Sequence, residues 1–188
     1  MFRNGIISFV LGLCLTALSG CGGQLYTVAP LPSVVPPDPS ANVVDGFNVL
    51  ATVIDGDQSL ERFEANLPLA GVVAVDVQLI NRTAAAINVN SLKFHLKDAG
   101  GQSLQEIEPK RALKQVMKYY GDGFYRLDAR QRTIESYEAV TLPLILAIAP
   151  QEERRGILFF QIQRNTVKPS GLTLSVSGSK TPVNVKLN

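Results

Sequence analysis

The sequence predicts a mainly β protein, an antiparallel β-sandwich of about seven strands with a short helical insertion. Beyond residue 45, apolar and polar residues alternate in several short runs, which is the period of a half-buried strand. Turn-forming residues separate these runs at hairpin spacing, and near residues 109–136 the apolar period changes to that of a helix.

Residues 1–20 divide like a signal peptide, with Arg3 as the positive start and an apolar run over residues 6–18. This run holds about thirteen residues, whereas a helix needs about twenty to cross a bilayer core. The run ends in Leu18-Ser19-Gly20-Cys21, in which two small residues precede a cysteine. This order resembles the lipobox of bacterial lipoproteins.

The lipobox resemblance implies that a peptidase cuts before Cys21, whose thiol carries a diacylglycerol and whose amine is acylated. The membrane is then one partner, and the covalent lipid is the only cofactor that we expect. Gly22 stands where an aspartate commonly signals inner-membrane retention, which implies an outer-membrane location facing the periplasm. The alternatives are an ordinary secretory signal with a chance cysteine and an N-terminal anchor helix.

Cys14 leaves with the signal, so the mature chain has no pair of cysteines for a disulfide.

Residues 21–45 predict a tether between the lipidated cysteine and the domain. Five prolines lie here among small residues: Pro30, Pro32, Pro36, Pro37 and Pro39. Proline favours extended polyproline geometry, and a fully extended tether of this length would reach roughly 70 Å. A proline-rich segment can also be a ligand for an aromatic groove, but beside a lipid anchor we expect a spacer.

Residues 46–188 form the predicted β domain, in which seven stretches have strand character. They are residues 47–54, 73–79, 92–96, 140–147, 157–162, 172–176 and 183–187. Residues 157–162 are apolar on both faces for most of their length, as in a central strand, and Pro143 places residues 140–147 at an edge or a bulge. Residues 81–83 and 98–101 supply turns between strands.

Glu108-Pro109 interrupts the strand pattern and opens a predicted amphipathic helix over residues 110–120. Its apolar face carries Leu113, Val116, Met117 and Tyr120, and its solvent-exposed face carries Lys110, Lys114 and Lys118. After Gly121-Asp122-Gly123 the pattern is ambiguous, and residues 124–137 are compatible with a second helix carrying Phe124, Leu127 and Ile134.

Several turn and strand motifs recur in the predicted domain. Residues 69–83 form a strand that runs into a Leu-x-Asn-x-Thr turn, and residues 92–101 form a strand closed by Asp-x-x-Gly. Residues 149–160 add a proline–acidic–glycine entry into another strand. Over residues 47–188 these motifs resemble bacterial lipoproteins and envelope proteins with an immunoglobulin-like, telokin-like sandwich. The resemblance implies a binding or scaffolding module and carries over no catalytic residue.

The candidates for catalysis or metal binding are isolated from suitable partners. His95, the only histidine, is flanked by two lysines on the exposed face of its strand, and no second histidine joins it. Asp55-Gly56-Asp57 lacks the glycine that a calcium loop needs at its sixth position, so we expect a turn there. Residues 152–155 form a solvated cluster of two glutamates and two arginines. We therefore expect no enzyme activity, no catalytic residue and no metal site.

Residues 109–132 hold seven basic residues against two acidic ones and are rich in aromatic residues. Aromatic side chains with arginines are enriched at interface hot spots. The candidate interaction face is Lys110, Arg111, Lys114, Lys118, Tyr119, Phe124, Tyr125 and Arg126. It could meet another envelope protein, a polysaccharide or anionic headgroups. The alternative is that the aromatic residues cap the end of the sandwich and the charges only solvate it.

Together these features predict a lipid-anchored cell-envelope protein that acts as a non-catalytic binding or scaffolding module for another envelope protein or polymer. Nucleic acid is not an expected partner, because the mature chain is close to neutral. Two alternatives stay open. One is an envelope hydrolase with an unrecognised carboxylate site, and the other is a periplasmic assembly chaperone that pairs a sheet edge with a client strand.

Overall fold

The computed structural model describes residues 25–31, 43–44, 46–122, 127–143, 147–178 and 182–187. The strands are β1 (Val43–Val44), β2 (Phe47–Ile54), β3 (Val72–Asn81), β4 (Lys93–Lys97), β5 (Ser103–Ile107), β6 (Glu153–Gln161), β7 (Leu172–Ser177) and β8 (Val183–Leu187). The helices are α2 (Gly56–Phe63), α3 (Pro109–Tyr120) and α4 (Leu127–Val140), with a 3-10 turn η1 (Val89–Ser91). The predicted signal peptide and Cys21 lie outside the described residues.

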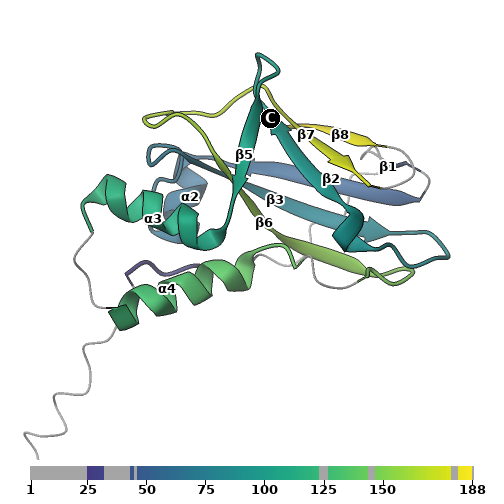
Figure 1. The fold of residues 1–188 in the computed structure, drawn as a ribbon, viewed down its shortest axis with the longest axis horizontal. Helices are drawn as coiled ribbons and strands as arrows, with labels where there is room; N and C mark the ends of the chain where they lie inside the picture. Colours follow the sequence, from purple (N-terminus) through teal and green to yellow (C-terminus); the bar gives the residue numbers. More distant parts are fainter. Residues whose placement is uncertain are drawn as a thin grey trace, which may run out of the picture.

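The strands join in one antiparallel sheet in the order β1-β2-β3-β6-β5-β4-β7-β8 (Figure 1). The sheet curls until β2 and β8, near its two ends, contact each other, so it nearly closes into a barrel. The prediction of a mainly β, antiparallel domain is therefore confirmed. An immunoglobulin-like sandwich is not confirmed, because β5 pairs with both β4 and β6 and makes the sheet continuous.

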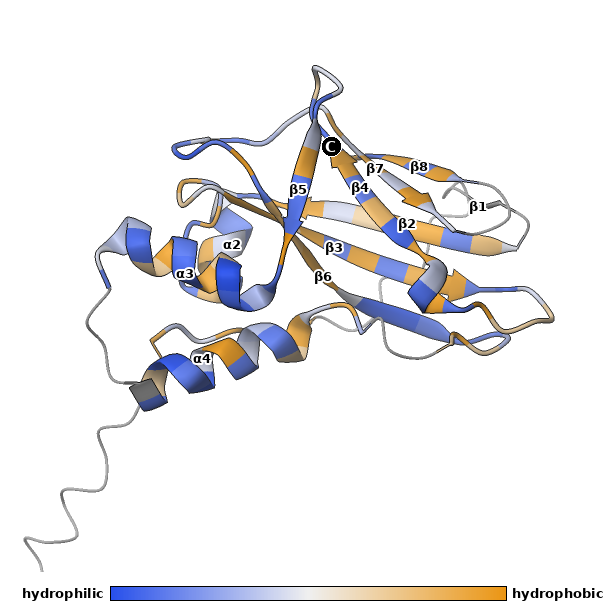
Figure 2. Cartoon of the chain, in the orientation of Figure 1, coloured by the Kyte–Doolittle hydropathy of each residue, from blue (hydrophilic) through white to orange (hydrophobic). Residues whose placement is uncertain are grey.

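The inner face of the curled sheet encloses the first hydrophobic core. Side chains on a strand alternate between its two faces, so every second residue of β3, from Val73 to Leu79, points inward. Leu158 and Phe160 of β6 join them, and β4, β7 and β8 close the core from the other side. Figure 2 shows this alternation of hydrophobic and hydrophilic residues along β4.

A second core lies between the outer face of β3 and β6 and the helices, which gather on one side of the sheet (Figure 1). Phe63 of α2, Tyr137 of α4 and Phe159 of β6 form an aromatic cluster there, with ring centroids 5.2 to 6.0 Å apart. β6 is thus buried on both faces, as predicted for a central strand.

Two predictions about local structure are wrong. Asp55 does not begin a turn but caps α2: its carboxylate accepts a hydrogen bond from the Gln58 N–H at 2.9 Å, and the Gln58 side chain accepts one from the Asp55 N–H. The strand predicted over residues 140–147 is absent from its described part, because Val140 ends α4 and Thr141 makes only an isolated bridge with Ile157. The sequence pattern was ambiguous over residues 124–137, and the structure places helix α4 there, from Leu127 to Val140.

Candidate functional site

Helix α3 presents the described part of the predicted interaction face. Pro109 occupies its first turn, and Gly121 ends it in the left-handed conformation with φ 79°. The inner side of the helix buries Ala112, Leu113, Val116 and Met117 against the second core. Lys110, Arg111, Lys114, Lys118 and Tyr119 are all exposed. The remaining predicted members, Phe124, Tyr125 and Arg126, lie outside the described residues.

The exposed side of α3 is a row of positive charge, because Lys110, Lys114 and Lys118 follow one another every four residues. No acidic residue occurs within the helix. Arg111 donates a hydrogen bond to the Gln161 side chain at 3.0 Å, which links the start of α3 to β6. We call these four basic side chains and Tyr119 the basic face of α3.

Residues 25–31 lie across the helices, where the sequence predicted part of a free tether (Figure 1). Tyr26 is only 7% exposed, its ring lies 6.3 Å from that of Tyr120, and its hydroxyl donates to the Asp122 carboxylate. The Leu25 N–H donates to Thr133 Oγ1 of α4 at 3.0 Å, and the Ala29 N–H donates to a carbonyl of α2 at 2.7 Å. This segment is therefore part of the folded domain.

An opening lies between β4 and β5, which pair at only one end. Their ladder joins Leu96 to Leu104 and Lys97 to Ser103. Beyond Leu104, β5 pairs with β6 while β4 stays on β7, so the two strands diverge. A hollow of about 410 Å³ occupies the opening and is lined by Leu92, Lys93, Phe94, His95, Leu104, Gln105 and Glu106.

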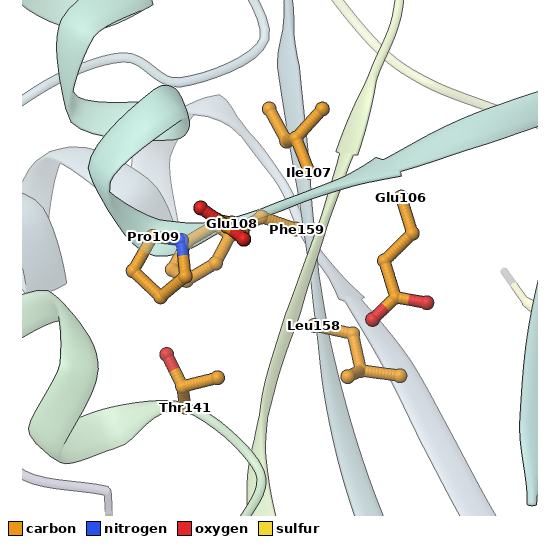
Figure 3. A pocket seen from close by; sticks show the side chains of 7 residues that line it. All are labelled: Glu106, Ile107, Glu108, Pro109, Thr141, Leu158 and Phe159. Carbon is orange, nitrogen blue, oxygen red and sulfur yellow. The ribbon is translucent and has the colours of Figure 1, made fainter.

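Glu106 borders both this hollow and a second one of about 390 Å³ where β5 meets α3. Figure 3 shows its carboxylate beside Leu158, whereas Glu108 and Pro109 lie on the other side of the β6 ribbon. Glu106 is exposed, but its carboxyl is partly desolvated by its surroundings; this desolvation raises the pKa of Glu106, and the charge of His95 partly lowers it. His95 itself is exposed, as the sequence predicted.

The charged residues 152–155 are not one solvated cluster. Arg155 forms a two-point pair with Asp76 of β3, with Nε–Oδ1 and Nη2–Oδ2 distances of 2.9 and 2.8 Å. Both side chains are largely buried, and Arg62 of α2 lies 3.4 Å from the same carboxylate. The hydrogen bonds that the Arg155 guanidinium donates to the Asp76 carboxylate stabilise its charged form and raise the pKa of Arg155 above its ordinary value. This group joins β3, β6 and α2.

The described residues hold neither a cluster of metal ligands nor a membrane-spanning helix. Over the described ranges, no group of three His, Cys, Asp or Glu side chains is placed to hold a metal ion. None of the described helices is long and apolar enough to span a bilayer.

No protein-family model matches the chain, and no curated protein matches it. Two solved structures are similar at low levels. An ApaG protein from Pseudomonas aeruginosa shares 14% identity with a TM-score of 0.34, over 71% of this chain and 97% of that one. A conserved hypothetical protein from Bacillus anthracis shares 13% identity with a TM-score of 0.37, over 77% of this chain and 90% of that one.

Proposed function

We propose that this chain is a lipid-anchored cell-envelope protein that acts as a non-catalytic binding or scaffolding module. The observation that carries the proposal is the order Leu18-Ser19-Gly20-Cys21 after a short apolar run. Several acyl chains on one cysteine make membrane attachment durable, since a single chain binds only marginally. Gly22 supports attachment to the outer membrane, facing the periplasm.

The anchor is tested on the native protein purified from membranes. We expect the intact mass of a chain that begins at a triacylated Cys21, and we expect Cys21→Ser to leave the membrane fraction. An unmodified chain that still begins at Met1 would overturn the anchoring.

The opening between β4 and β5 supports the alternative of an assembly chaperone, in which a sheet edge binds its partner by pairing with a strand of it. Where the ladder stops, residues 93–95 of β4 present a strand edge that β5 does not cover. An extended polypeptide can add to such an edge through main-chain hydrogen bonds, and hollows beside the edge receive its side chains. This geometry suits an extended segment, and we propose that the segment belongs to another envelope protein.

A crosslinking experiment in intact cells tests this binding site. A photoreactive amino acid replaces His95 or Gln105 at the opening, and Asn184 on β8 serves as the matched control, since all three side chains are exposed. We expect a discrete protein adduct from the first two positions and none from the control. Equal adducts at all three positions, or none at the opening, would remove the opening as the binding site.

The hydrolase alternative requires two carboxylates facing one substrate. Glu106 and Glu108 border the same hollow, but their side chains lie on opposite sides of β6 (Figure 3). This arrangement does not favour a paired-carboxylate reaction at that hollow.

A further inference from the structure

The position at which the chain enters the domain limits how the domain sits on its membrane. Cys21 precedes Leu25 by four residues, and four residues span at most about 14 Å. The Leu25 N–H is already bonded to α4, and Tyr26 is buried beside Tyr120 and Asp122 at the end of α3. The lipid on Cys21, which rests on the function proposed above, therefore holds the helical side of the domain close to the bilayer.

The three helices differ in charge, and this difference selects the side that faces the bilayer. α2 and α4 each carry acidic residues among their basic ones, whereas α3 carries four basic residues and no acidic one. Lys118 lies in the last turn of α3, next to the place where the chain enters, and Lys110 is about 12 Å farther along the helix axis. A surface charge acts over only about 8 Å at physiological salt, so the position of Lys118 beside the entering chain decides whether the membrane can attract it.

We propose that the basic face of α3 lies against the anionic phospholipid headgroups of the membrane that carries the lipid anchor. The short connection from Cys21 brings the face within range, and the positive charge orients it. Tyr119, which is 36% exposed at the same end of the helix, suits the boundary between headgroups and acyl chains. The domain then rests on the membrane surface, in place of hanging from a long spacer.

The first test labels lysine amines of the mature, lipidated protein with a water-soluble reagent and measures each site by mass spectrometry. The protein is studied in detergent, in phosphatidylcholine vesicles and in vesicles that also contain phosphatidylglycerol. On the anionic vesicles we expect labelling of Lys110, Lys114 and Lys118 to slow by about fivefold, the factor contributed by one charge near an anionic bilayer. Lys93 of β4 and Lys186 of β8, both exposed, should keep their detergent rates.

The second test asks whether charge holds the face in place, using two variants with equal change in net charge. One is Lys110→Gln with Lys114→Gln and Lys118→Gln, and its control is Lys93→Gln with Lys97→Gln and Lys186→Gln; all six side chains are exposed. The readout is modification of Arg111 by an arginine-specific dicarbonyl, on anionic vesicles relative to detergent. Protection of Arg111 should persist in the control and disappear in the α3 variant.

The outcomes separate this proposal from the one on which it rests. A chain without lipid on Cys21 would refute the anchoring before any vesicle is used. A lipidated chain whose α3 lysines label equally in detergent and on anionic vesicles would overturn the orientation and leave the anchoring intact. Equal protection on phosphatidylcholine, which carries no net charge, would overturn the electrostatic contact. Protection that survives about 1 M salt, where screening shortens to ~3 Å, would overturn it as well.

Discussion

Gly156→Ala is expected to destabilise the fold strongly, because β6 touches the neighbouring backbone at this position. Gly156 lies opposite Val77. An added Cβ would lie 2.1 Å from the Cα of Leu142 and 2.3 Å from its nitrogen. Contact at 3.4 Å, the near limit of ordinary packing, would require the Leu142 backbone to retreat by about 1.3 Å.

This retreat has two costs that can be estimated. Overpacking of a filled core costs about 1–3 kcal/mol. The hydrogen bond from the Leu142 N–H to the Ile157 carbonyl, 3.1 Å long, would also be weakened or lost, at about 1 kcal/mol. We therefore expect the free energy of unfolding to fall by about 2–4 kcal/mol, or roughly 4–16 °C in Tm for a domain of this size.

Urea unfolding followed by circular dichroism measures this change. Gly100→Ala is the control, since its added Cβ would meet only the Asp98 Oδ1 at 3.3 Å. We expect the control to stay within about 0.5 kcal/mol of the parent chain. If Gly156→Ala unfolds at the same urea concentration as the control, the segment after α4 does not pack on β6 and the reasoning fails.

Three further changes test polar side chains that are buried or partly desolvated. The Tyr137 hydroxyl is fully buried with no hydrogen-bond partner among the described residues. Tyr137→Phe should therefore raise the free energy of unfolding by about 1 kcal/mol. A decrease in this free energy, measured by urea unfolding, would contradict the expectation. Arg155→Met removes the two-point partner of the largely buried Asp76 and should lower the free energy of unfolding by about 3 kcal/mol. Asp76→Leu in the same chain should restore much of this loss. No recovery in thermal unfolding would count against the pair. Burial raises the pKa of Glu106, so the folded state binds this proton more tightly than the unfolded state, and stability should fall as pH rises from the ordinary glutamate pKa through the raised one. Glu106→Gln should remove that part of the pH dependence, and identical unfolding profiles of the two chains between pH 4 and 8 would exclude it.

Periodicity predicted the strands that have one face in the inner core. In β4, Phe94 and Leu96 are buried while Lys93, His95 and Lys97 are exposed, so the burial repeats the sequence alternation. β5 was missed because Leu104 is half-buried in the inner core and Ile107 is buried in the outer one, three residues apart. No alternating signal arises when one strand changes partners along its length.

The false strand over residues 140–147 has a similar cause. Val140 packs in the helical layer, whereas Leu142 and Ile148 fill the inner core, and the described residues around them make only the isolated bridges of Thr141 and Ile148. These apolar residues are buried by different parts of the fold, so their spacing carries no period of a single element. Sequence pattern detects burial here but not the structure that causes it.

The candidate sites also differ in whether a local sequence pattern can predict them. The basic face of α3 follows from helical spacing within twelve residues, which a sequence pattern can show. The docking of Tyr26 depends on Asp122, ninety-six residues away, and the opening depends on β5 leaving β4 to pair with β6. Both are properties of long-range pairing, which no local motif in the sequence specifies.

The opening and the basic face are joined by a short connection, because β5 ends at Ile107 and α3 begins at Pro109. The chain enters the domain at the far end of α3, beside Tyr120 and Asp122. A helix of twelve residues is about 18 Å long, so the opening lies roughly one helix length from the place where residues 25–31 dock. If α3 rests on the headgroups, any extended partner at β4 is held close to the membrane surface. This geometry suits a partner that is itself at the membrane, and the crosslinked adducts should therefore come from membrane-associated proteins.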